Sequence, residues 1–175
     1  MYKLATMPQS KNKYNLTKLQ SDCLYRTLKE EVDGPPEAVP PGVARIHRSG
    51  EKISVITWGA MLHRCSAAAE KAQNDWGISC EILDLRSLCP LDLDAIYETV
   101  RKTGKVLVIH EDNLTGGAGS EIAARIGEHC FEDLDAPVRR IAAMDVPIPY
   151  AATLEDASLP DENRILEEIR QLSAW

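Results

Sequence analysis

One segment constrains the fold of this 175-residue chain more than any other, the continuous apolar run Val106-Leu107-Val108-Ile109. A strand with apolar side chains on both faces has to be buried on both sides, which is typical of a parallel sheet covered by helices. Strand-like segments also occupy residues 53–58, 78–85 and 138–142, with helical periodicity between them. The sequence therefore predicts a chain that alternates strands with helices.

Four segments are predicted as helices because their apolar residues lie on one helical stripe. Residues 60–74 form the first helix, and Gly77 is its C-terminal cap. Asp92 is a suitable N-cap for the second helix, which Gly104 ends. The third covers residues 121–131, and the last follows a proline-rich loop. The residues expected to face the core are Met61, Leu62, Cys65, Ala69, Ala72, Leu93, Ile96, Tyr97, Val100, Ile122, Ile126, Cys130, Ile165, Leu166, Ile169 and Leu172.

These elements define a fold class. Four strands linked by helices are expected to be parallel, with right-handed crossovers and helices on both faces of the sheet. Residues 43–47 form a further strand at an edge, and only the turn 48–51 separates it from the strand over 53–58. The two would be antiparallel neighbours if they pair. We predict an α/β fold, a three-layer doubly wound mixed sheet with four parallel strands and one antiparallel strand.

A proline-rich stretch marks the domain boundary. Four prolines fall within seven positions of residues 33–42, which excludes a helix or a central strand and predicts an extended linker. Residues 1–20 carry four lysines and no acidic residue, and they lack the apolar middle of a signal peptide. We therefore expect a disordered extension and linker over residues 1–42 and a single domain over residues 43–175.

Charge and cysteine content exclude several classes of protein. The formal net charge of −7 argues against nucleic acid and against an anionic membrane surface as partners. No apolar run reaches the about 20 residues that a membrane span needs. The cysteines form no C-x-x-C pair, which argues against a disulfide framework or a zinc site and predicts reduced thiols in the cytoplasm. They are Cys23, Cys65, Cys80, Cys89 and Cys130.

Ligands of open parallel sheets bind beyond the carboxyl ends of the strands. That rule selects four segments, residues 57–59, 84–86, 110–112 and 145–147. The most suggestive continues as the glycine-rich loop 110–120, which leaves the most buried strand and enters a helix whose N–H groups could face an anion. However, the loop contains Glu111 and Asp112, has no Lys or Arg, and matches no phosphate-binding motif. Close packing of the loop against the helix is the simpler interpretation.

His110 can exchange a proton near neutral pH, and Glu111 beside it could tune that equilibrium. Adjacent residues at a strand end point in opposite directions, so the pair need not act together, and a histidine that only bonds the backbone is an equal interpretation. No His, Cys, Asp and Glu set has metal-ligand spacing, and no serine has a G-x-S-x-G setting. We predict no catalytic and no metal-binding residue. The candidates for an active-site mouth or interface loop are His110, Glu111, Thr115, Gly116, Gly117 and Gly119.

Six segments resemble beta subunits of the thiamine-diphosphate-dependent 2-oxo acid dehydrogenases. Two of them are Asp84-Leu85-Arg86-Ser87-Leu88-Cys89-Pro90-Leu91-Asp92 and Asp145-Val146-Pro147-Ile148-Pro149-Tyr150, and the others cover residues 24–32, 53–59, 110–119 and 134–140. Each segment alone is weak, but their order and spacing are specific. The resemblance runs from about Cys23 to the C-terminus and implies a transketolase C-terminal-type domain.

The resemblance also implies a function and partners. Members of this family use thiamine diphosphate and Mg²⁺ to decarboxylate pyruvate, branched-chain 2-oxo acids or acetoin, and they pass the acyl group to a lipoyl acyltransferase core. Their C-terminal domain contacts a second beta subunit and helps to dock the acyltransferase, whereas the cofactor lies between the alpha subunit and the N-terminal domain of the beta subunit.

Residues 1–22 resemble nothing in that N-terminal domain, so the activating glutamate has no counterpart in this sequence. We therefore expect the chain to be inactive alone and to bind no cofactor by itself, because half a site cannot hold cofactor, substrate and base together. Two other interpretations stay open. One is a stand-alone, non-catalytic interaction module, with a homodimer as one form, and the other is a flavodoxin-like nucleotide-binding domain.

Overall fold

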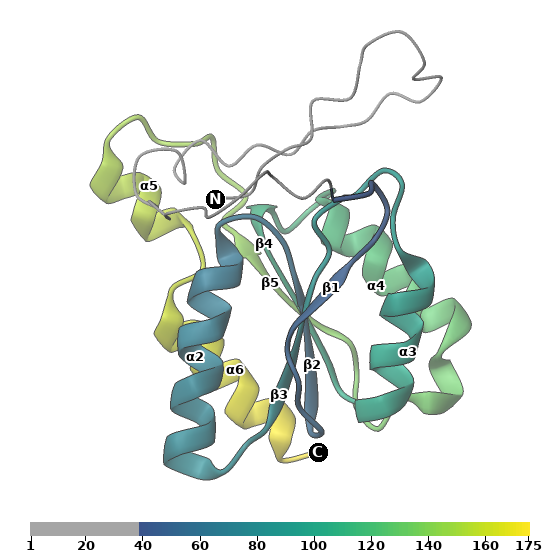
Figure 1. Ribbon diagram of the computed structural model, residues 1–175. Coiled ribbons are helices and arrows are strands. Elements are labelled where there is room, and N and C mark those ends of the chain that lie inside the picture. Colours follow the sequence, from purple (N-terminus) through teal and green to yellow (C-terminus); the bar gives the residue numbers. More distant parts are fainter. Residues whose placement is uncertain (1–38) are drawn as a thin grey trace, which may run out of the picture.

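The structure, a computed structural model, describes residues 39–175, so the expected extension and most of the linker lie outside the described residues. Its centre is a five-stranded sheet with the strand order β1-β3-β2-β4-β5 (Figure 1). The four later strands are parallel and β1 is antiparallel, which confirms the predicted fold class. The strands are β1 (Arg45–Arg48), β2 (Ile53–Thr57), β3 (Cys80–Asp84), β4 (Val106–Asn113) and β5 (Arg139–Ala143).

The first two strands do not pair with each other, so the condition for an antiparallel hairpin is not met. β1 pairs with β3 and not with β2, so that Arg45 lies opposite Asp84. β2 has parallel neighbours on both sides, β3 and β4, and therefore offers no free edge to a third strand. The turn before β2 instead passes over the start of β3, where a β-carbon on Gly50 would overlap the backbone of Cys80. Only glycine allows two backbones to approach so closely.

Helices cover both faces of the sheet and complete three layers (Figure 1). On one face lie α2 (Met61–Trp76) and α6 (Glu162–Ser173), and on the other lie α3 (Leu93–Thr103) and α4 (Ala118–His129). Each face has its own aliphatic core, because successive side chains of a strand point to opposite sides. Val106 and Val108 of β4 pack toward α3 and α4, whereas Leu107 and Ile109 pack toward α2 and α6.

The predicted helical stripes face these cores. All five stripe residues of α2 are buried, as are the three that were predicted for the third helix and its end. At the margins of the α3 and α6 stripes, Leu93, Tyr97 and Leu166 are only partly buried. The apolar period therefore located the helices and their inward faces, while the edge of each stripe meets solvent.

Two boundaries near the carboxyl edge of the sheet differ from the expectation. β4 continues to Asn113, and α4 begins at Ala118 rather than at residue 121. Glycine is a poor helix former, so Gly117 and Gly119 concealed the start of this helix. A short helix, α5 (Ala152–Ser158), also forms inside the proline-rich loop that was predicted without regular structure.

Candidate functional site

His110 lies near the carboxyl end of β4 and is completely buried. Its ring stacks on the indole of Trp58, the residue that follows β2, with ring centroids 5.2 Å apart and an interplanar angle of 7°. Because β2 and β4 are parallel neighbours, their carboxyl ends meet at one edge of the sheet and bring the two rings together. The strand pairing therefore explains a contact between residues that lie far apart in the sequence.

The start of α4 packs against the edge of the His110 ring, whereas Trp58 packs against its face. A β-carbon on Gly119 would overlap the ring atoms Cδ2 and Nε2, and one on Gly117 would lie 2.8 Å from Cε1. Real β-carbons essentially never approach other atoms so closely. The two glycines therefore let the helix backbone pack directly against the imidazole, and the ring occupies the place that a phosphate would take in a glycine-rich anion site.

The surroundings of His110 favour its neutral form. Burial lowers the pKa of the imidazole below its ordinary value, and the charge of Arg140 lowers it further, while the Asp112 carboxylate and backbone oppose the shift. Within the described residues neither ring nitrogen has a hydrogen-bond partner of good geometry. A charged imidazolium has two N–H donors, and for these the enclosure offers, among the described residues, only the backbone of Asp112 as a hydrogen-bond acceptor.

A second set of contacts fixes the tip of the loop. The backbone N–H and the hydroxyl of Thr115 donate to the two carboxylate oxygens of Asp145, at 3.0 and 2.6 Å. These hydrogen bonds lower the pKa of Asp145 because they stabilise its charged form. Arg140 of β5 donates to the carbonyl oxygen of Leu114 at 3.1 Å and also to the hydroxyl of Ser120. The tip of the loop and the first turn of α4 are therefore held by Arg140 of β5 and by Asp145, which follows that strand.

The structure divides the six sequence-predicted candidates into two groups. His110, Gly117 and Gly119 form one buried contact, while Thr115 and Gly116 lie at the exposed tip of the loop. The remaining candidate, Glu111, is half-buried. Trp58, Arg140 and Asp145 were not among the candidates. Trp58 and Asp145 do lie in segments that the strand-end rule selected, whereas Arg140 lies only in the segment 134–140, which carries part of the family resemblance.

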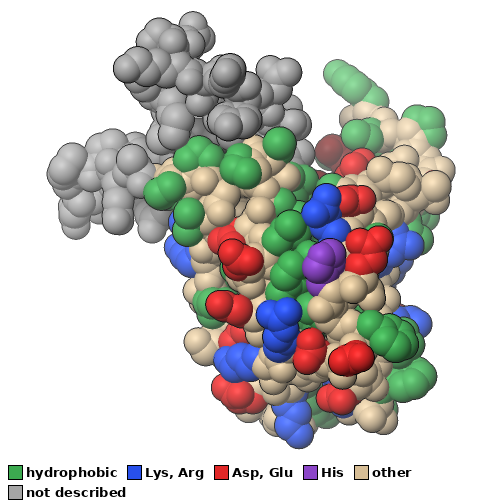
Figure 2. All heavy atoms as spheres, turned by 90° about the vertical axis from the view of Figure 1, so that its right-hand side faces the viewer, with side chains coloured by type: hydrophobic (Ala, Val, Ile, Leu, Met, Phe, Trp, Pro, Cys, Tyr) green, Lys and Arg blue, Asp and Glu red, His purple; other side chains and the backbone are tan. Residues whose placement is uncertain are grey.

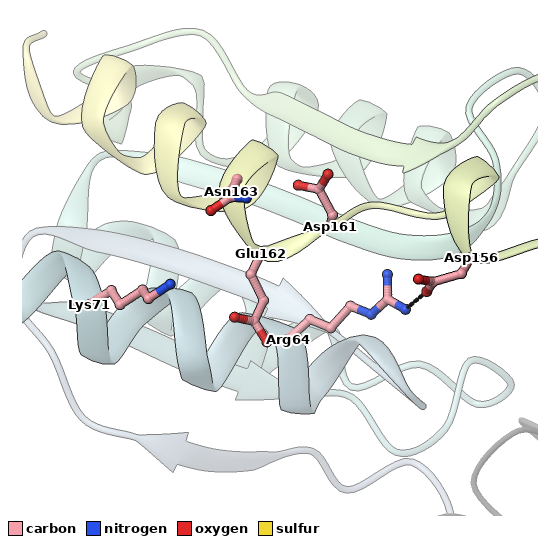
Figure 3. A pocket seen from close by; sticks show the side chains of 6 residues that line it. All are labelled: Arg64, Lys71, Asp156, Asp161, Glu162 and Asn163. Atoms are coloured by element: carbon pink, nitrogen blue, oxygen red, sulfur yellow. Dashed lines mark hydrogen bonds and ion pairs between the residues drawn. The ribbon is translucent and has the colours of Figure 1, made fainter. Parts of the chain in front are cut away.

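The groove between α2 and the start of α6 is a second surface feature (Figure 3). The Arg64 guanidinium of α2 forms an ion pair with Asp156 of α5 and donates to the carbonyl oxygen of Pro160 at 2.8 Å. Asp161 accepts from the backbone N–H of Arg164 at 2.7 Å and caps α6. The arginine and these acids are thus used to hold the short helix and the chain after it, and the groove shows no set of groups arranged for catalysis.

The other helical face carries mixed charge. Figure 2 shows acidic and basic side chains interspersed over the face that α3 and α4 form, without a continuous basic area. Among the described residues no cluster of three or more His, Cys, Asp or Glu side chains could hold a metal ion. Within the same part of the chain, no helix combines the length and the apolar character that crossing a bilayer requires.

Comparison with known proteins places this domain. The family model "Transketolase, C-terminal domain" matches residues 42–165. The 2-oxoisovalerate dehydrogenase subunit beta of Bacillus subtilis is 43% identical over 86% of this chain and 46% of its own length. The pyruvate dehydrogenase E1 component subunit beta of Porphyra purpurea is 38% identical over 85% of this chain and 45% of its own length.

A solved structure shares the fold. A protein described as "Split gene transketolase, inactive beta4 tetramer" superposes with a TM-score of 0.68 at 23% identity, over 83% of this chain and 46% of that one. The chain thus spans less than half the length of the relatives named here. On its five-stranded sheet and on the match over residues 42–165, the chain belongs to the transketolase C-terminal domain family.

Proposed function

We propose that this chain is the C-terminal part of a 2-oxo acid dehydrogenase beta subunit and serves subunit assembly and acyltransferase docking rather than turnover by itself. The observation that carries the proposal is the identity of 36–43% to beta subunits over 82–88% of the chain. The names of these relatives include 2-oxoisovalerate and pyruvate dehydrogenases. A 2-oxo acid of one of these two kinds is therefore the proposed substrate of the assembled enzyme.

An exposed apolar segment that runs from the end of β5 into α5 supports a role in assembly. Five large hydrophobic side chains within eleven residues are exposed, and Ile148 and Tyr150 are the most open of them, at 82% and 106% of full exposure. Apolar patches of this kind on a soluble protein mark contacts with other protein surfaces. The segment comprises Met144, Val146, Ile148, Tyr150 and Leu154.

The complete enzyme of this family would use thiamine diphosphate with Mg²⁺, but the described residues do not fit that cofactor. A diphosphate with its metal needs free cationic or N–H donors and oxygen ligands for the ion. At the carboxyl edge, Arg86 and Arg140 donate to backbone carbonyl groups. The first turn of α4 is filled by the His110 ring. We therefore propose that the cofactor is held by other parts of the assembly, the alpha subunit and the N-terminal half of a beta subunit.

The same observations bear on the other interpretations. A flavodoxin-like site would need an open helix N-terminus for its phosphate, and here His110 closes that of α4. A second copy of this chain stays a proposed partner, in a contact between beta subunits. Relatives from Arabidopsis thaliana and Dictyostelium discoideum are named as mitochondrial, so the similarity favours neither the cytoplasm nor the mitochondrion.

Reconstitution tests the proposal. The full chain is co-expressed with the alpha subunit and the N-terminal beta half from the same genome, and carbon dioxide release from 2-oxoisovalerate and from pyruvate is measured with thiamine diphosphate and Mg²⁺. We expect activity only when all parts are present, and co-purification of the parts. Activity of the chain alone, or activity of the other parts that is unchanged when the chain is omitted, would contradict the proposal.

A matched pair of variants tests the apolar segment. Ile148→Asp places a charge in the exposed segment, so we expect it to weaken co-purification with the other parts. Phe131→Asp changes a side chain that is also exposed, at 76%, but lies beyond the far end of α4, and we expect it to leave assembly intact. Equal effects of the two substitutions would show that the segment has no special role.

A further inference from the structure

His110 is enclosed by three different parts of the fold. The Trp58 indole after β2 covers one face of the ring, and the backbone of Gly117 and Gly119 at the start of α4 lies against its edge. The third part is β5, which contributes the charge of Arg140 nearby. The ring is therefore held by packing alone, since neither of its nitrogens has a hydrogen-bond partner of good geometry in the part of the chain that the structure describes.

Burial, the start of α4 and Arg140 oppose a positive charge on this ring. A charged ring loses its hydration when it is buried, and the N-terminus of a helix carries a partial positive charge that repels a cation. Arg140 on β5 adds like charge, whereas the carboxylate and the backbone of Asp112, on the His110 strand itself, act in the opposite direction. The indole face of Trp58 attracts a cation only weakly, and the glycines at the start of α4 bring no acidic side chain. The enclosed site thus accepts a neutral ring and resists a charged one.

We propose that His110 is a proton-sensitive latch for the loop between β4 and α4, closed when the imidazole is neutral and released when it is protonated. In the closed state the ring fixes the first turn of α4 against Trp58. In the released state the imidazolium leaves the stack for water, and Gly117 and Gly119 lose their packing partner. The proposal rests on the packing of this domain and does not depend on the function proposed above.

The opening is confined to one end of the loop. The carboxylate of Asp145 has a lowered pKa, so it stays charged while His110 becomes protonated. Its two hydrogen bonds with Thr115 therefore persist and keep the loop tip attached to the end of β5. The movement is accordingly expected in the segment from Gly116 to the first turn of α4, not in the whole carboxyl edge.

The sign of the pH dependence follows from the lowered pKa of His110. An unfolded chain takes up a proton near the ordinary pKa of about 6.5, whereas the folded chain does so only at lower pH. Between these values the unfolded state binds more protons, so stability falls as the pH falls. One such group changes the unfolding equilibrium constant by up to about tenfold per pH unit.

Urea unfolding of the full chain between about pH 7.5 and pH 5.5 measures this dependence. We expect the unfolding equilibrium constant of the wild type to rise on acidification more steeply than that of His110→Gln, by up to about tenfold per pH unit. His63→Gln, which removes an exposed histidine of α2, is the matched control and is expected to follow the wild type. His47 also has a pKa lowered by burial, but it has the same surroundings in His110→Gln and so cancels between that variant and the wild type. The charge of His63 makes the smallest contribution to that lowering, so His63→Gln is expected to change the slope only slightly.

Hydrogen exchange distinguishes a local release of this loop from a loss of stability of the whole domain at low pH. At the lower pH, and after correction for intrinsic exchange, peptides covering residues 116–122 are expected to lose protection while peptides from α6 (Glu162–Ser173) retain it. This measurement needs only the wild type, so it decides the matter even if His110→Gln fails to fold. Uniform loss of protection, or none, overturns the latch, as does a pH slope in His110→Gln that equals that of the wild type.

Discussion

Gly119→Ala is the substitution that most directly tests the packing of α4 against His110. Within a helix, alanine is normally more favourable than glycine by about 0.5–1 kcal/mol, because glycine loses more backbone freedom on folding. At position 119, however, the new methyl group would lie closer than 3.0 Å to the His110 ring. Relief of such overlap shifts a buried ring or the backbone, and overpacking of this kind costs about 1–3 kcal/mol.

Gly127→Ala in the same helix is the matched control. A β-carbon there meets no atom within 4 Å, so only the gain in helix propensity remains. We expect Gly119→Ala to lower the free energy of unfolding by about 1–3 kcal/mol and Gly127→Ala to raise it by about 0.5–1 kcal/mol. Urea titration followed by circular dichroism at neutral pH measures both values, provided that the slope with urea is unchanged.

The double variant His110→Ala with Gly119→Ala identifies the source of the effect. Removal of the imidazole leaves room for the methyl group, so most of the cost of Gly119→Ala should disappear in the His110→Ala background. Contacting residues commonly show such coupling, whereas distant ones are additive within about 0.5 kcal/mol. Stabilisation by Gly119→Ala, or strict additivity of the two changes, would refute the proposed contact.

Two further predictions follow from the pKa shifts. Because the Thr115 hydrogen bonds lower the pKa of Asp145, this carboxylate stabilises the fold above its ordinary pKa of 3.8, and the contribution is lost as the pH falls through the lowered value. Asp145→Asn is therefore expected to flatten the loss of stability in acid unfolding followed by circular dichroism, and an unchanged acid limb would contradict this. Burial raises the pKa of the Cys65 thiol to about 12 and that of Cys80 to about 11, whereas Cys89 is exposed. Mass spectrometry after brief iodoacetamide treatment is expected to find Cys89 modified in the native protein and the other two only after unfolding, and native modification of either buried thiol would disprove their protection.

The apolar pattern predicted the layers of this fold but not the order of its strands. Residues 106–109 identified a central strand because every side chain there needs a buried environment on one face or the other. The position of β1 depends on which edges are left free after β2, β3 and β4 have paired, and that is a property of the whole sheet. The short turn before β2 suggested a hairpin, but local turn length does not decide pairing when the second strand is already central.

For the candidate loop, too, the sequence marked the segment but not the side chains from other strands that contact it. Its glycines, together with a histidine at a strand end, indicated a special site, and the structure shows why glycine is needed at two of these positions. The stacking partner Trp58 and the anchor Arg140 come from β2 and β5, so their proximity depends on strand order rather than on motif spacing. Sequence reasoning can select the ends of strands, but it cannot choose the pairs that meet there.

From these contacts we propose that the carboxyl edge serves as an interface rather than as a catalytic centre. A catalytic histidine needs a ring nitrogen within reach of substrate, and both nitrogens of His110 are sealed from solvent. Thr115 and Asp145 bond to each other, and Arg140 bonds to the loop backbone, so these polar groups maintain the loop conformation instead of facing a substrate. The exposed side chains next to this loop are those of the apolar segment 144–154. A fixed loop beside exposed apolar side chains has what a protein partner requires, since preorganised surfaces lose little entropy on binding.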